Sequence, residues 1–137
     1  MGVDIEALVA WGISIGSLPA ALEREDWEDV YARNAGLGAP QQRYSESNAS
    51  EWQEYWRRRS ALLEGSGCTL QLHGDEGQYH WCAIVTESVR ETSVSKAPLQ
   101  LLVPTPPDSW HRQLETFCNT LGIECAQPGW LLVVWVH

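Results

Sequence analysis

Two hydrophobic periodicities alternate along this chain of 137 residues, and their order restricts the fold more than any other feature. Apolar side chains recur at every second position in residues 3–15, which predicts a strand. They recur at helical spacing in residues 50–64 and again in 108–121, which predicts two helices. The last stretch, residues 130–137, is apolar on both faces and predicts a buried strand.

The middle of the chain predicts a β-hairpin. Strands at 68–73 and 78–86 flank the turn residues 74–77, which contain two glycines. A turn centred on this stretch places Leu72 opposite Tyr79, and it divides the hairpin into an apolar face and a polar face.

A helical segment that breaks near Asp26 is predicted between the first strand and residue 36, with Ser17 as its N-cap. The order is then strand, helix, helix, strand, strand, helix, strand. This order predicts a single α+β domain, residues 1–137, of the ferredoxin-like (split βαβ) type. Its mostly antiparallel four-stranded sheet would carry the helices on one face. Residues 89–107 contain four prolines and predict either a packed loop or a short edge strand at 99–103.

The balance of charge limits the class of partner. The net charge is −9, which disfavours nucleic acid because phosphate repels such a chain. No segment is long and apolar enough to predict a membrane span, and the N-terminal residues lack the positive charge of a signal peptide. We therefore expect a cytoplasmic protein with four free thiols and no cofactor.

The polar face of the hairpin holds the candidates for chemistry. His80 and Cys82 are two residues apart on one strand, and His73 lies on its neighbour. Imidazole and thiolate groups in this proximity could bind zinc or form a Cys–His nucleophile pair. The alternative is a solvated sheet face whose histidines have no role, and the absence of a further ligand at motif spacing favours it.

Two surfaces are candidates for partner binding. Five carboxylates lie within seven residues, and four of them, Glu25, Asp26, Glu28 and Asp29, are the predicted contacts to a basic partner. The alternative is the solvated face of an amphipathic helix.

The second surface is the sheet face opposite the helices, where Leu131, Val133 and Trp135 share one side of the last strand. An exposed apolar patch there would mark a protein partner or a homodimer. The alternative is that residues 89–107 fold over it.

Arginine next to aromatic residues is a pattern of single-stranded nucleic-acid binding, and it occurs at Arg57, Arg58 and Arg59 beside Trp52 and Trp56. Three consecutive helical residues point in different directions, so they do not form one patch. The chain has eight tryptophans, and we expect most of them, including this pair, in the core.

Residues 1–15 and the stretch Trp110–Gly122 followed by Gly129-Trp130 resemble parts of small uncharacterised proteins encoded by bacteriophages and prophages. The resemblance covers about a third of the chain and carries no functional residues across. It implies an accessory protein that binds and blocks a host factor such as a defence nuclease.

The hypothesis that follows is a non-catalytic protein-binding protein, such as a phage-type inhibitor or an immunity protein. The sequence has no GxxxxGK[ST], GxGxxG or HExxH motif, which favours binding over catalysis. A small metal-binding or Cys/His enzyme using the hairpin face, and a dimeric small-ligand sensor, remain alternatives.

Overall fold

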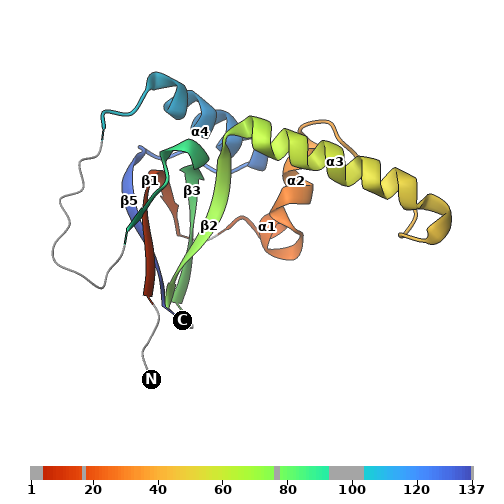
Figure 1. Ribbon diagram of the computed structural model, residues 1–137, viewed down its shortest axis with the longest axis horizontal. Coiled ribbons are helices and arrows are strands. Elements are labelled where there is room, and N and C mark those ends of the chain that lie inside the picture. The colour runs from red at the N-terminus through yellow and green to blue at the C-terminus, as the bar shows by residue number, and fades with distance from the viewer. Residues whose placement is uncertain (1–4, 17, 76–77, 93–103, 137) are drawn as a thin grey trace.

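The computed structural model describes residues 5–16, 18–75, 78–92 and 104–136, with the backbone alone at strand residues 5–6, 75, 78–79, 91–92 and 135–136. The strands are β1 (Ile5–Ile15), β2 (Cys68–Asp75), β3 (Gln78–Val85), β4 (Arg90–Thr92) and β5 (Gly129–Val136). The helices are α1 (Ala20–Arg24), α2 (Trp27–Asn34), α3 (Ala49–Ser66) and α4 (Asp108–Leu121), with short 3-10 helices η1 (Glu46–Asn48) and η2 (Thr86–Ser88). Figure 1 shows the α+β fold that the periodicities predict.

Strand β1 is the centre of the sheet. It pairs antiparallel with β5 over Ile5–Gly12, while its other edge pairs with β4 over Ala7–Val9 and with β3 over Gly12–Ile15. Strands β2 and β3 form the predicted antiparallel hairpin, and β2 also meets β5 in one parallel pair. Among the described residues the sheet thus has five strands rather than the predicted four, because the short β4 is added beside β1.

Gly12 is the point where β1 changes neighbours. It lies opposite Gly129 of β5 on one side and Ile84 of β3 on the other. A Cβ at this position would lie 2.0 Å from the carbonyl oxygen of Ala83 and 2.9 Å from the Cα of Ile84. Only a residue without a side chain allows the backbones of β1 and β3 to approach this closely.

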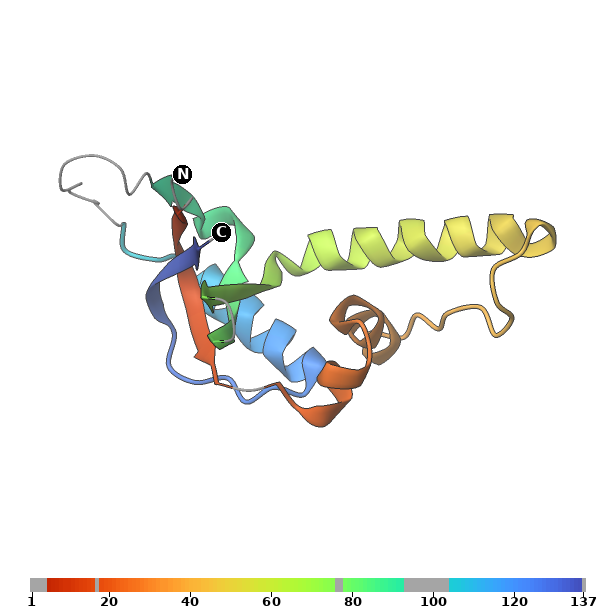
Figure 2. The same cartoon turned by 90° about the horizontal axis from the view of Figure 1, so that it is seen from below.

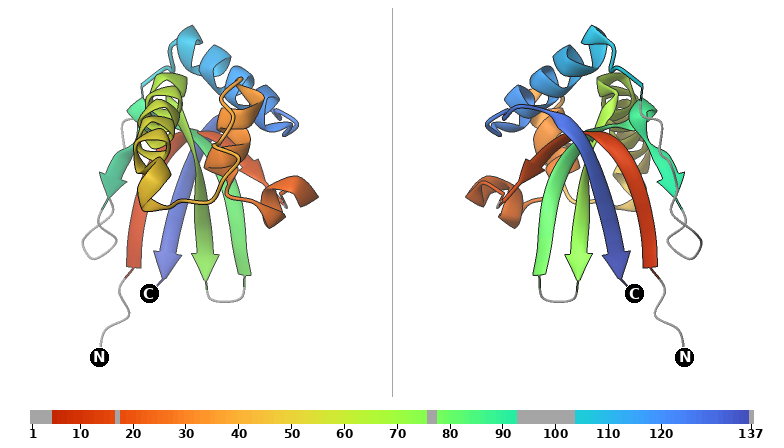
Figure 3. Two further views of the ribbon diagram at one scale, coloured as in Figure 1. Left: turned by 90° about the vertical axis from the view of Figure 1, so that its right-hand side faces the viewer. Right: turned by 90° about the vertical axis from the view of Figure 1, so that its left-hand side faces the viewer.

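The main core lies between the sheet and the helices, which gather on one face (Figure 3). The predicted buried stripe of the last helix is confirmed, since Leu114, Phe117 and Cys118 of α4 are fully buried. In the first helical segment, Leu22 of α1 and Val30 of α2 are also buried. Burial of aromatic and branched side chains at this face is the main stabilising contribution.

The helix ends follow local capping chemistry. The predicted break near Asp26 is confirmed, because the Asp26 carboxylate accepts a hydrogen bond of 3.0 Å from the backbone N–H of Glu28 and begins α2. The predicted stop of α3 at Gly65 is wrong by two residues. Gly67 ends the helix in the left-handed conformation, with φ of 70°. Ser17, the predicted N-cap, and the predicted strand at 99–103 lie outside the described residues.

The hairpin register differs from the prediction by two residues. Leu72 pairs with Trp81 and not with Tyr79, because β2 continues to Asp75 and β3 begins at Gln78. A shift of two residues keeps every side chain on its original face, so the predicted division into two faces survives the change of register.

Candidate functional site

The second face of the sheet forms a small core of its own. Ala10, Cys82, Ile84 and Val133 are each at most 1% exposed there, and Val89 packs against them. The prediction of an exposed partner surface is therefore wrong for Val133, while Leu131 is partly buried against the same cluster. Because β2 also pairs with β5, the pairings of β1, β5, β2 and β3 form a ring, so the sheet curves and brings these side chains into mutual contact.

Among the described side chains of β5, Leu132 is the exposed large apolar residue; it is 62% exposed and belongs to the other face. The backbone of Trp135 pairs with Glu6 and Gly74, while its side chain lies outside the described part of the structure.

The four acidic residues predicted to bind a partner interact with arginines of the same chain. Arg33 donates two hydrogen bonds to Glu25, of 2.8 and 3.2 Å. Arg59 of α3 donates a bond of 2.6 Å to Asp29 and lies 3.9 Å from Asp26 and 3.7 Å from Glu28. The acids thus join α2 to α3 and offer less free negative charge than the sequence suggests. Docking of a basic partner on them stays a prediction.

The hairpin face brings only part of the predicted metal set together. The rings of His73 and His80 face each other across the strands, with centroids 5.8 Å apart. Cys82 lies in the second core, where its thiol donates to the carbonyl of Gln71 at 3.4 Å. In the part of the chain that the structure describes, no three His, Cys, Asp or Glu side chains are placed to share a metal ion.

Burial also determines the state of the thiols. It raises the pKa of Cys82 to about 11, and it raises the pKa of Cys68 and of Cys118 to about 12, helped in both cases by nearby Cys125. Thiols with such pKa values are protonated near neutral pH, and the thiolate is the nucleophile. The three buried cysteines are therefore inert core residues, which weighs against a Cys–His nucleophile at Cys82.

We expect this burial to appear in thiol labelling. Of the four free cysteines only Cys125 is partly exposed. In the native protein the reagent DTNB should react readily with one thiol, and the other three should react only after denaturation. Cys125→Ser should remove the fast reaction. Rapid labelling of all four thiols in the native protein would contradict the burial.

A loss of stability at alkaline pH should follow from the same groups. Burial, followed by a hydrogen bond to Asp29, raises the pKa of Tyr55 to about 12 from its ordinary 10.0. Since Tyr55 and the buried thiols all have raised pKa values, their stabilising contribution is complete below about pH 9 and is lost as pH rises towards 12. The urea midpoint should fall steadily in this range. A midpoint that stays constant up to about pH 11 would contradict the assignment.

The largest departure from a compact shape is the N-terminal half of α3. Figure 2 shows this helix extending beyond α2 and α4, with its N-terminal end farthest from the sheet and the preceding loop returning beneath it. We call residues 37–58, which comprise this loop, η1 and the first half of α3, the arm.

Four aromatic side chains gather on the arm. The rings of Tyr44 and Trp56 stack with centroids 6.1 Å apart and an interplanar angle of 23°. Trp52 lies 5.7 Å from Trp56 and 5.8 Å from Tyr55, which is buried. Tyr44 is 57% exposed and Trp56 is 42% exposed, so the stacked pair presents apolar area to solvent.

Hydrogen bonds hold this cluster in place. The indole N–H of Trp52 donates to the carbonyl of Gln42 at 3.0 Å. Asn48 donates from its side chain to the carbonyl of Arg43 at 2.8 Å and accepts from the backbone N–H of Ser45 at 2.7 Å. At the base of the arm, the Tyr55 hydroxyl donates to Asp29 at 2.7 Å. The stacked pair is therefore fixed before any partner arrives.

The arm is electrically neutral although the whole chain carries −9. It contains three arginines and three glutamates, which cancel, and Arg57 and Arg58 both donate to Glu54, at 2.6–3.1 Å. These internal pairs use the cations that a nucleic-acid interface would need. The centre of a protein interface is likewise poor in free charge and rich in aromatic residues.

Sequence patterns alone did not identify this cluster. The helical spacing of Trp52 and Trp56 predicts that they are core residues. Tyr44 lies in the polar segment before this helix, where the sequence predicts a loop. Tyr44 and Trp56 are twelve positions apart and meet only because the loop turns back along α3. The sequence offered no sign of this, because the predicted helices at 50–64 and 108–121 are similar in length, and only in the structure is α3, with 18 residues, clearly longer than α4, with 14.

None of the helices in the described ranges has the length and apolar character needed to cross a membrane. No protein-family model, no curated protein and no solved structure matches this chain.

Proposed function

We propose that the protein is a non-catalytic binding protein and that the arm is its docking surface. The observation that carries this proposal is the Tyr44–Trp56 stack, an exposed aromatic pair formed between the loop and the N-terminal half of α3. Tryptophan and tyrosine are the residues that most often dominate binding energy at protein interfaces. The proposed partner is a protein with an apolar recess that accepts the pair.

Prior ordering of the stack supports this role. A partner that binds a fixed aromatic pair does not have to compensate for the entropy of ordering it. The hydrogen bonds of Trp52 and Asn48 provide that order in the free protein. An inhibitor or immunity protein of the kind found in bacteriophages would work in this way, because it occupies a surface of its target and performs no reaction. The four free thiols support a cytoplasmic site of action.

The test compares tagged wild-type protein with Trp56→Ala, Tyr44→Ala and Ser60→Ala in capture from a lysate of the source organism, quantified by mass spectrometry. Ser60 is an exposed residue of the same helix that lies outside the arm, and it serves as the matched control. We expect Trp56→Ala to weaken binding of the partner by about thirtyfold or more, as for an aromatic hot spot worth about 2 kcal/mol. Ser60→Ala should retain the partner.

Circular dichroism of each variant must first show wild-type helix content. A set of captured proteins that is the same for all variants would contradict the proposal. If the partner is a second copy, light scattering should show a dimer for the wild type and a monomer for Trp56→Ala.

We also infer that four strands follow the ferredoxin-like path. The inference is supported by the antiparallel pairs that β1 forms with β3 and with β5, and by the hairpin of β2 and β3, with β4 as an added edge strand. This fold hosts many functions, so the functional proposal rests on the arm and not on the fold.

A further inference from the structure

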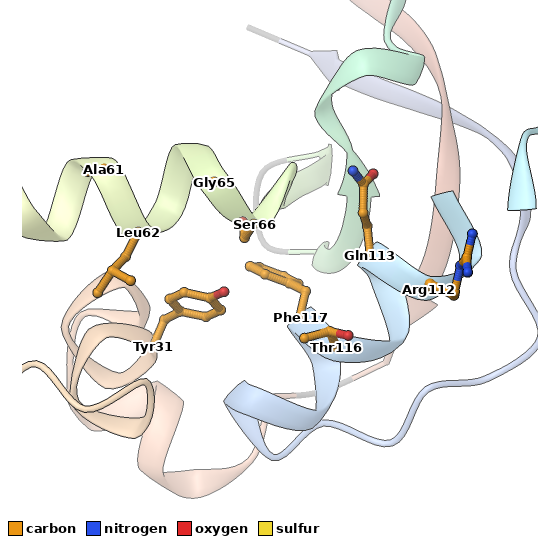
Figure 4. Close-up of a pocket in the computed structure, with 9 residues that line it drawn as sticks. All are labelled: Tyr31, Ala61, Leu62, Gly65, Ser66, Arg112, Gln113, Thr116 and Phe117. Atoms are coloured by element: carbon orange, nitrogen blue, oxygen red, sulfur yellow. The ribbon is translucent and has the colours of Figure 1, made fainter. Parts of the chain in front are cut away.

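A groove between α3 and α4 is separate from the arm. It has a volume of about 510 Å³ and is lined by Tyr31 of α2, by the C-terminal half of α3 and by α4 (Figure 4). Pockets that hold small ligands have volumes of roughly 300–1,000 Å³. The groove therefore has the size of a small-molecule site.

The floor of the groove is apolar and the rim is open. Tyr31 and Phe117 are buried and Leu62 is partly buried, and Figure 4 shows Leu62 beside the ring of Tyr31. Ala61 and Gly65 lie at the exposed rim on α3. A Cβ at Gly65 would meet no atom within 4 Å, so the glycine leaves open space at this point of the groove.

The polar groups of the groove lie on α4. The side-chain oxygen of Gln113 is buried and has no hydrogen-bond partner, which is an unusual cost for a folded protein. Rotation of the amide by half a turn would put its N–H groups in the same place. The hydroxyl of Thr116 lines the groove one helical turn further on.

Charge determines which ligand fits. Arg112 is the one charged residue among the nine that line the groove. It forms no ion pair with another residue that the structure describes. None of the nine lining residues is acidic, although the chain as a whole carries −9. In Figure 4 the Arg112 side chain points away from Tyr31 and Leu62, and as an exposed side chain it can turn towards the rim at little cost.

From these observations we propose that the groove binds a small organic anion, with an apolar body against Tyr31, Leu62 and Phe117 and a carboxylate or sulfonate held by Arg112 and the Gln113 amide. The apolar body gains from leaving water, and the anion meets the one cation of the groove. The Gln113 amide can offer only its N–H groups to the anion, because its oxygen is a buried acceptor.

The experiment uses the full chain and two probes, anilinonaphthalene sulfonate (ANS), whose fluorescence rises in apolar sites, and phenylbutyrate as a competitor. We expect saturable ANS binding at one site, and amide shifts in the NMR spectrum that centre on Leu62, Gly65 and Gln113. Phenylbutyrate should displace ANS at a concentration at which its neutral amide does not.

Variants locate the site. Gly65→Leu and Ala61→Trp each fill the groove and should weaken ANS binding by about tenfold or more, since they occupy the space of the apolar body. Arg112→Gln should weaken it about two- to fivefold, the effect of one exposed ion pair. Arg24→Gln, which removes the same charge from α1, a helix that does not line the groove, should leave binding unchanged.

All variants are first compared with the wild type by circular dichroism, and either groove-filling variant suffices if the other does not fold. The proposal is overturned if ANS affinity is unchanged in the folded groove-filling variants, or if the wild type shows no saturable binding. It is also overturned if the neutral amide competes as well as phenylbutyrate, or if the NMR shifts centre on Tyr44 and Trp56.

Discussion

Val133→Asp should unfold the protein, whereas the same substitution one residue earlier, Leu132→Asp, should be tolerated. Val133 is 1% exposed and packs with Ala10, Cys82 and Ile84 in the second core. A carboxylate there has no cation beside it in the described cluster and loses its hydration, at a cost of about 3–5 kcal/mol in addition to the lost valine contacts. That sum approaches the whole stability of an ordinary domain.

Leu132 is the matched control, because it lies in the same strand and is 62% exposed. We expect Leu132→Asp to change the free energy of unfolding by no more than about 0.5 kcal/mol. Urea denaturation followed by circular dichroism measures both variants. Equal stability of the two variants would mean that the second face of the sheet is open to solvent, as the sequence pattern had suggested for Val133.

Gly12→Ala should have the second largest effect. The new Cβ would lie 2.0 Å from the carbonyl oxygen of Ala83, and neither that oxygen nor the Cα of Ile84 at 2.9 Å belongs to a flexible side chain. The backbones of β1 and β3 must separate, which breaks the pairing of Gly12–Ile15 with β3. We expect a loss of about 3 kcal/mol or more, at the upper end for overpacking in a core.

Gly65→Ala is the opposite case and a suitable control. Gly65 has no positive φ, lies in the last turns of α3, and would meet nothing within 4 Å. Replacing glycine by alanine in a helix should raise the stability by about 0.5–1 kcal/mol. Thermal unfolding of the two variants should therefore shift in opposite directions. An unchanged or raised melting temperature of Gly12→Ala would contradict the close approach at Gly12.

The hydrophobic patterns predicted the helices and strands well, because these elements depend on residues close to one another in the sequence. The period of two in residues 3–15 and the helical stripe of 108–121 each depend on neighbours a few positions away, and both elements form nearly as expected. Asp26 caps α2 through a bond to a residue two positions on, so the break in the first helical segment was also visible in the sequence. The faces of the hairpin followed from alternation alone, although its register did not.

The candidate sites were harder to predict because they depend on residues far apart in the chain. In the sequence, Asp29 belongs to a run of acidic residues that predicts free negative charge. In the structure Arg59, thirty residues later, forms an ion pair with it. Trp56 reads as a core residue, yet α3 runs past the elements that would cover it. Cys82 reads as a ligand beside His80, yet it faces the second core.

The sequence by itself determined which segments form strands and helices and which side chains share a face, because these properties arise from backbone geometry and from contacts within a few residues. Only the tertiary structure decided which faces are covered. Val133 and Leu132 differ by one position in an apolar strand, and the curved sheet packs Val133 against side chains of β1 and β3 while Leu132 stays exposed. Burial depends on what packs against a face, and here those partners come from distant parts of the chain.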